Sequence, residues 1–269
     1  MTIRLRACEV FGETLIRLQG IHVTYRRWGQ SLTALAEVDL EVKAGQWVMI
    51  VGHNGSGKST LLKLIAGQQE ATSGWVEING SPKCGGAGGF DSDLFQVCQD
   101  PLLGTADGLT LMENLVVADP SPQGRGPSPR GRRDRYMELL SQFDLAQRAN
   151  QLLRYFSGGE RQQVALIIAK LRNPQILLLD EPLAALDPSR LPMCEQLIAS
   201  MNAAGSTILQ ITHDMSTAQT TGHRTIAFEA GRILYDHSGE ERSRTTSDLG
   251  ADVRQAEGGG DKASSRVNR

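Results

Sequence analysis

The segment GHNGSGKST, residues 52–60, constrains this chain more than any other because it matches the pattern GxxxxGK[ST] in full. The almost wholly apolar run WVMIV precedes it, as expected of a strand buried on both faces of a parallel sheet. The following STLLKLIAG has apolar residues at helical spacing and ends at Gly67. A chance glycine-rich turn is the alternative, but a strand, a loop and a helix in this order predict a phosphate-binding loop.

The composition of this phosphate loop, residues 52–60, has a physical reason. Glycines let the backbone curl so that successive N–H groups point at anionic oxygens, next to a helix N-terminus. We expect Lys58 to place its charge over the β and γ phosphates of ATP, and the Ser59 hydroxyl to ligate Mg²⁺. His53 is given no individual role. The predicted ATP-binding residues of the loop are Gly52, His53, Asn54, Gly55, Ser56, Gly57, Lys58, Ser59 and Thr60.

A second apolar strand, ILLLDEP at residues 176–182, delivers two acids at its C-terminal end, where ligands of parallel α/β sheets gather. We expect Asp180 to hold Mg²⁺ and Glu181 to act as the general base that deprotonates an attacking water. An acidic pair here could instead cap the next helix.

The segment FSGGERQ, residues 156–162, starts an amphipathic helix that we expect to run from Gly159 to Leu171 and to close before Pro174. A helix N-terminus with a hydroxyl and two glycines is a second anion cradle. Ser157 as a simple N-cap, with flexible glycines after it, is the alternative.

The remaining pattern predicts an α/β chain. Short β-like runs lie between residues 15 and 51, and apolar strands at 175–180 and 206–212 flank a helix at 192–203 before a hairpin at 224–235. The middle of the chain predicts helices at 110–117 and 132–143. Residues 119–135 are rich in Pro, Gly and Arg, which indicates an exposed, mobile insertion, and the polar residues 239–269 indicate a disordered tail.

Composition excludes some functions. The net charge of −2 argues against a general nucleic-acid binder, and no run of about 18 apolar residues is present to cross a membrane. The four cysteines lack CxxC spacing, so neither a zinc site nor a disulfide framework is expected; they are Cys8, Cys84, Cys98 and Cys194.

Five motifs together resemble the ATP-binding cassette (ABC) family of ATPases, over residues 18–235. In chain order they are the phosphate loop, SGGERQ, ILLLDEP, AALD and ITHD. The resemblance implies a P-loop NTPase fold, with a RecA-like core, an antiparallel β subdomain and an inserted helical subdomain. The implied ABC domain spans 15–238, with its core at 15–98 and 174–238 and the helical subdomain at about 99–173.

The resemblance also implies further site residues. Tyr25 matches the aromatic that stacks on adenine, although a strand tyrosine could equally fill the core. Gln99 matches a residue that touches Mg²⁺ and the attacking water. His213 matches a histidine that contacts the γ-phosphate, although a lone histidine there could be structural, and Asp187 matches a loop that communicates across a dimer.

The signature segment, Ser157, Gly158, Gly159 and Glu160, faces the phosphate loop of a second subunit in this family. Phe156, Glu160 and Ala184 replace the usual Leu, Gln and Ser, which are mild changes. Because one cassette is present, the resemblance implies pairing with another, most simply as a homodimer.

A single cassette without membrane segments or long coiled coils resembles the ATPase subunit of a prokaryotic importer. The implied partners are an integral membrane permease, an extracytoplasmic substrate-binding protein acting indirectly, and no nucleic acid; the implied location is the cytoplasmic face of the membrane. The segments QDPLLGTADGLTLMENL and GRILYDHSGEERSRTTSDL resemble a group associated with tryptophan and tyrosine uptake. A soluble ABC protein acting on nucleic acid or the ribosome, or an exporter ATPase, are the alternatives.

The basic run Arg130 to Arg135 lies in the predicted insertion. It could touch anionic lipid headgroups under a membrane, or it could serve only to keep an exposed segment solvated.

Overall fold

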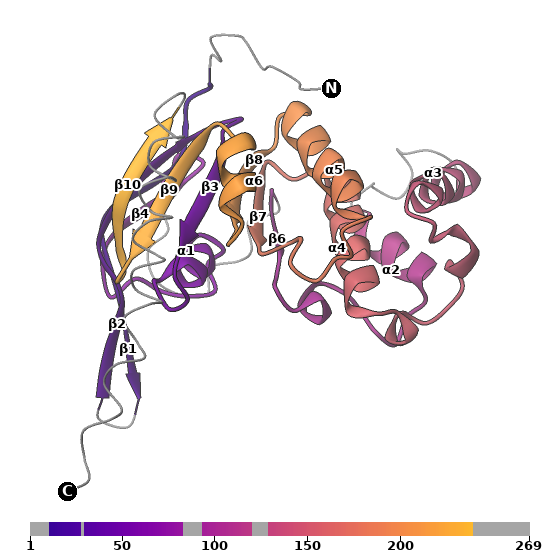
Figure 1. The fold of residues 1–269 in the computed structure, drawn as a ribbon, viewed down its shortest axis with the longest axis horizontal. Helices are drawn as coiled ribbons and strands as arrows, with labels where there is room; N and C mark the ends of the chain where they lie inside the picture. The colour runs from indigo at the N-terminus through magenta and orange to yellow at the C-terminus, as the bar shows by residue number, and fades with distance from the viewer. Residues whose placement is uncertain (1–10, 28–29, 83–92, 120–128, 239–269) are drawn as a thin grey trace, which may run out of the picture.

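Two β-sheets and a group of helices make up the chain in the computed structural model, which describes residues 11–27, 30–82, 93–119 and 129–238 (Figure 1). The predicted tail at 239–269 lies outside the described residues, as do Cys8, Cys84 and residues 120–128 of the predicted insertion.

The first sheet is antiparallel and has the strand order β2-β1-β4-β5. Its long strands β1 (Thr14–Arg27) and β2 (Gln30–Lys43) pair with each other, and β1 also pairs with β4 (Ser73–Ile78), next to the short β5 (Ser81–Pro82). The C-terminal part of β2 alternates buried and exposed residues, so one face of this sheet packs inward. This sheet confirms the expected antiparallel β subdomain.

The second sheet has the order β10-β9-β3-β8-β7-β6, with only β10 antiparallel to its neighbour. Its strands are β3 (Trp47–Gly52), β6 (Leu94–Val97), β7 (Ile176–Asp180), β8 (Thr207–Ile211), β9 (Arg224–Glu229) and β10 (Arg232–Ser238). The fully buried β7 and β8 are the apolar runs that the sequence predicts. The predicted hairpin joins β9 to β10 through Ala230 and Gly231, both with positive φ, as a two-residue turn requires.

Two hydrophobic cores cover the opposite faces of the second sheet. One face packs against α1 (Lys58–Ile65) and the antiparallel sheet, and the other packs against the helical group. Neighbouring residues of one strand point to different cores: Ile50 joins the α1 core and Met49 the helical core. Helices α5 (Leu191–Ala203) and α6 (Met215–Thr220) contribute to the helical core.

The helical group lies at the far side of the second sheet from the antiparallel sheet (Figure 1). It contains η1 (Pro101–Gly104), α2 (Leu111–Ala118), α3 (Pro129–Gln142), η2 (Ala146–Arg148), η3 (Leu153–Tyr155) and α4 (Gly158–Arg172). Helix α4 ends before Pro174, as predicted, and its C-cap Asn173 has the left-handed conformation. No helix among the described residues is long and apolar enough to cross a membrane.

Helix α3 begins earlier than expected. The composition of residues 119–135 predicts an irregular insertion and a helix from Arg132, yet α3 starts at Pro129. Proline is favourable in the first helical turn, where its missing N–H has no helical partner, so it can start this helix. The basic run Arg130 to Arg135 is therefore helical, which corrects the expected extent of the insertion.

Candidate functional site

The phosphate loop lies between the C-terminal end of β3 and the start of α1, as expected. Gly57 caps α1 with φ of 108°, and a Cβ atom there would lie 2.5 Å from the Ala34 carbonyl oxygen. No other residue fits this position without moving the backbone. The β9–β10 turn contacts the phosphate loop, because the Gly231 N–H donates to the Ser56 carbonyl at 2.9 Å.

Lys58 is held inside the loop and is only 5% exposed. Its Nζ donates to the carbonyl oxygens of Gly52 and His53, each at 2.7 Å. Burial lowers the pKa of Lys58, while Glu181 and Asp180 act to raise it. The loop therefore presents a desolvated cation at its centre, which favours a bound anion.

Ser56 supplies independent evidence that the loop fits a phosphate. Its Oγ is buried and has no hydrogen-bond partner among the described residues. An unpartnered buried hydroxyl is costly, and a ligand oxygen would satisfy it.

Asp180 and Ser59, the two residues expected to hold Mg²⁺, interact with each other. The Ser59 hydroxyl forms a hydrogen bond with the Asp180 carboxylate. Burial raises the pKa of Asp180, and this hydrogen bond together with Lys58 and Lys63 opposes the rise. A hydroxyl and a carboxylate are oxygen donors of the kind that Mg²⁺ takes, so these two residues fit the predicted ion.

The predicted catalytic pair is in direct contact. Nε2 of His213 lies 2.7 Å from Oε1 of Glu181. Glu181 directly follows β7 and has φ of 51°, a left-handed conformation that is rare for a residue with a side chain. Its N–H donates to the Ile211 carbonyl of β8 at 3.3 Å. Strained backbone of this kind recurs at functional sites.

Gln99 and Tyr25 lie at two edges of the site. Gln99 is exposed and follows β6, the neighbour of the strand that carries Asp180. The Tyr25 hydroxyl lies 3.4 Å from Oγ1 of Thr60, beside the phosphate loop. Its ring packs partly against the core of the antiparallel sheet, so core filling and adenine stacking both stay open for Tyr25.

The signature segment begins α4. Ser157 is the N-cap, and its Oγ accepts from the Glu160 N–H. The N-cap interpretation is therefore confirmed, and the anion-cradle role stays a prediction. A Cβ at Gly159 would lie 2.8 Å from the Ala185 carbonyl oxygen, whereas a Cβ at Gly158 would meet nothing within 4 Å. Gly159 packs against the loop that carries the exposed Asp187, and Gly158 has open space around it.

The two predicted anion sites belong to different faces of one sheet. Helix α1, which follows the phosphate loop, packs on one face of the second sheet, and α4, which carries the signature segment, packs on the other (Figure 1). No hydrogen bond, ion pair or ring contact joins residues 52–60 to residues 157–160 in the part of the chain that the structure describes. The chain brings Glu181, His213, Asp180 and Lys58 together, but not the signature segment with them.

Sequence reasoning missed Arg148. Its guanidinium forms an ion pair with Glu160 and stacks on Phe156, so it contacts the signature segment directly. Nothing in the local pattern around residue 148 signals this, because the contacts join residues that are eight and twelve positions apart.

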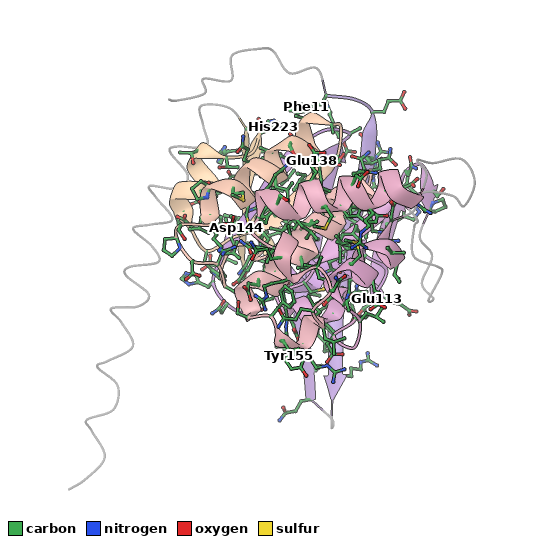
Figure 2. The ribbon with its side chains drawn as sticks, turned by 90° about the vertical axis from the view of Figure 1, so that its right-hand side faces the viewer. Phe11, Glu113, Glu138, Asp144, Tyr155 and His223 are labelled. Atoms are coloured by element: carbon green, nitrogen blue, oxygen red, sulfur yellow. The ribbon has the colours of Figure 1, made fainter. Side chains whose placement is uncertain are left out.

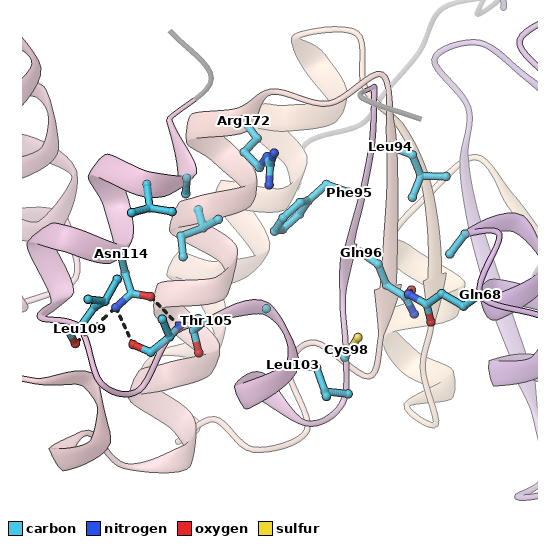
Figure 3. A pocket seen from close by; sticks show the side chains of 16 residues that line it. Gln68, Leu94, Phe95, Gln96, Cys98, Leu103, Thr105, Leu109, Asn114 and Arg172 are labelled. Atoms are coloured by element: carbon cyan, nitrogen blue, oxygen red, sulfur yellow. Dashed lines mark hydrogen bonds between the residues drawn. The ribbon is translucent and has the colours of Figure 1, made fainter. Parts of the chain in front are cut away.

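A cavity of about 580 Å³ lies next to Gln99, between β6 and helices α2 and α4 (Figure 3). Cys98 lines it, and so do Leu103 and Val117, which are 74% and 75% exposed. Asn114 fixes one wall, because its side chain donates to the Ala106 carbonyl at 2.9 Å and accepts from the Ala106 N–H at 2.8 Å. We call it the α2 cavity.

Comparison with known proteins gives a consistent picture. A family model described as ABC transporter matches residues 35–184. The aliphatic sulfonates import ATP-binding protein SsuB 1 of Burkholderia lata is 36% identical over 234 residues, which cover 87% of this chain and 67% of that protein. SsuB 2 of Agrobacterium fabrum is 37% identical over 204 residues, covering 75% and 73%.

Solved structures agree with these relatives. A dimeric ATP-binding cassette in a post-hydrolysis state, bound to ADP and Pi, is 30% identical with a TM-score of 0.71, covering 83% of this chain and 98% of that one. An ATP binding subunit of an ABC transporter is 28% identical with a TM-score of 0.74, covering 91% and 99%.

Proposed function

This chain belongs to the ABC transporter family and is an ATP-hydrolysing subunit of it. We propose that two copies close on two ATP molecules to energise import of a small solute. The fold is the expected P-loop NTPase cassette, with an antiparallel sheet and a helical group added to a parallel core. In the proposed domain division, residues 15–238 form the cassette and about 99–173 form its helical subdomain.

The observation that supports pairing most directly is the placement of α1 and α4 on opposite faces of the second sheet. Among the described residues, no hydrogen bond, ion pair or ring contact joins the phosphate loop to the signature segment of the same chain. A second copy can present its Ser157 and Gly158 to a phosphate on that loop. The solved dimeric cassette, which is similar over 83% of this chain, supports this arrangement.

In the proposed mechanism the phosphate loop fixes the triphosphate and Glu181 serves the attacking water. The loop N–H groups and Lys58 would hold the β and γ phosphates, and Ser59 with Asp180 would hold Mg²⁺. Bound Mg²⁺ supplies charge neutralisation on the phosphate oxygens. The water oxygen bonds to the γ phosphorus while the bond to the β–γ bridging oxygen breaks, which releases ADP and phosphate, and Glu181 accepts the proton.

His213 has two roles in this proposal. Its contact with Oε1 of Glu181 orients the carboxylate, and the same imidazole is placed to reach the γ-phosphate when ATP is bound. Gln99 and Tyr25 are proposed at the metal and the adenine, respectively.

The α2 cavity is the proposed docking place of the permease. Exposed Leu103 and Val117 give it an apolar rim, which suits an apolar segment of a partner. Gln99 follows Cys98 of its wall, so a segment seated there would contact the strand end beside the metal site. The proposed location is therefore peripheral, on the cytoplasmic face of the membrane.

The proposal also concerns which solute is transported. The SsuB relatives are named for import of aliphatic sulfonates, which supports a small organic solute and gives the tryptophan or tyrosine expectation no support. We propose that the permease and an extracytoplasmic binding protein select the solute.

The test is Glu181→Gln. This variant keeps the shape of the side chain but removes the base, so we expect ATP binding to remain and turnover to fall by on the order of 100-fold or more. Glu195→Gln is the matched control, since Glu195 lines a cavity beside His213 but is assigned no step. Near-normal turnover of Glu181→Gln in a steady-state phosphate-release assay would remove Glu181 from its proposed role.

A further inference from the structure

Arg148 ends η2 and makes four contacts, one of them with Glu160 of the signature segment and three with residues that precede that segment. Its Nε donates to Oε1 of Gln151 at 2.7 Å, Nη1 donates to Oε1 of Glu160, and Nη2 donates to the Tyr155 carbonyl at 3.1 Å. Its guanidinium carbon also lies 3.9 Å from the ring centroid of Phe156. Tyr155 itself points outward at the surface (Figure 2). The Arg148 side chain therefore contacts both the residues just before the signature segment, Tyr155 and Phe156, and its last residue, Glu160.

The carboxylate of Glu160 is shared between Arg148 and Ser157. Oε1 accepts from Arg148, and Oε2 accepts from the Ser157 N–H at 2.8 Å and from the Ser157 hydroxyl at 3.0 Å. A serine hydroxyl has a single hydrogen, so Ser157 donates it to Glu160 here and cannot donate it elsewhere at the same time. Burial alone would raise the pKa of Glu160, but these hydrogen bonds bring it below its ordinary value, so the side chain is an anion at neutral pH.

A carboxylate in this place conflicts with the proposed function. Glu160 lies in the first turn of α4, where a negative charge suits the helix N-terminus. The same N-terminus has to receive the triphosphate held by another copy, and like charges repel. Arg148 is the cation that faces Glu160, with side chains 29% and 23% exposed, so its charge is only partly screened by water.

We propose that Arg148 is a positioning residue for the half of the ATP site that one copy lends to the other: it neutralises Glu160 and leaves Ser157 able to turn its hydroxyl hydrogen toward a phosphate oxygen. This inference rests on the proposed pairing of two copies. It assigns Arg148 no contact with ATP. Its action passes through Glu160 and through the stacked Phe156.

The N-terminal cap of α4 does not require Arg148. The capping box between Ser157 and Glu160 is formed within one turn of chain, so removing Arg148 leaves it in place. Loss of Arg148 instead leaves a partly buried anion unpaired at the surface that a phosphate must approach.

The experiment measures ATP-driven dimerisation in the Glu181→Gln background, by analytical ultracentrifugation with MgATP. We expect Arg148→Ala to weaken dimerisation at least about tenfold, while a fluorescent ATP analogue still binds the single chain within about twofold of the parent. Adding Glu160→Gln to Arg148→Ala should recover most of the loss, because no unpaired charge then remains. Arg154→Ala is the matched control, since Arg154 is exposed and lies in the same segment.

The outcomes separate the inference from the proposed function. If the Glu181→Gln parent does not dimerise with MgATP, the pairing itself is wrong and the inference fails with it. If the parent dimerises and Arg148→Ala dimerises equally well, the inference alone is overturned. It is also overturned if the double variant stays as weak as Arg148→Ala, because Arg148 would then act by packing on Phe156 and not through the charge of Glu160.

Discussion

At the scale of single residues, Glu181 has a left-handed backbone conformation that its motif does not predict. Its φ is 51°, and its side chain contacts His213, whereas that of Asp180 interacts with Ser59. In the proposed function the two adjacent acids serve the water and the metal separately. The strain could not be predicted, because it depends on how the residues after β7 hydrogen bond to β8.

The two glycines of the signature segment give a matched test at this scale. Gly159→Ala places a methyl group against the Ala185 carbonyl, and we expect it to lower the free energy of unfolding by about 1–3 kcal/mol. Gly158→Ala meets open space and should change stability by less than about 0.5 kcal/mol. Urea denaturation of both variants measures the difference. Equal stability of the two would mean that Gly159 is not packed against Ala185.

Sequence reasoning reached most of the site's residues but not Arg148. Contiguous motifs identify Lys58, Asp180 and Glu181, because the chemistry needs these residue types next to a strand end. Arg148 acts through contacts with Phe156 and Glu160 that only the folded helical group brings together.

At the scale of elements, the helices and strands that carry motifs lie where the sequence predicts them. Apolar runs such as those of β7 and β8 are predictable since every residue is buried. The start of helix α3 is harder to predict from the sequence, because its first turns carry mostly charged residues and its amphipathic pattern is weak. Composition alone therefore predicts an irregular insertion at residues 129–131, where the structure has the first turn of α3.

The α2 cavity gives a prediction at this scale. Leu103→Asp places a charge on its apolar rim, so we expect the cassette to lose co-purification with a co-expressed permease while its affinity for ATP stays unchanged. Leu234→Asp is the control, because Leu234 is 46% exposed on β10. Unchanged co-purification of Leu103→Asp would place the permease elsewhere on the cassette.

At the scale of the whole molecule, the second sheet lies between the helices that carry the two halves of the proposed ATP site. The phosphate loop belongs to the face covered by α1, and the signature segment to the face covered by α4. The sequence predicts both halves and, through family resemblance, their use by different copies. It could not show the separation, since that follows from which helix packs on which face.

Complementation between two inactive variants measures this division of the site most directly. Lys58→Ala breaks the phosphate loop, and Gly158→Asp puts a like charge in the open space where a phosphate has to approach. Each variant alone should hydrolyse ATP at a few per cent of the parent rate or less, on the order of a 100-fold loss. In an equal mixture, half of the dimers are expected to be mixed, and each has one intact site. Mixing should therefore restore activity to roughly a quarter of the parent rate. An unchanged rate on mixing, or full activity of Gly158→Asp alone, would contradict a site shared between two copies.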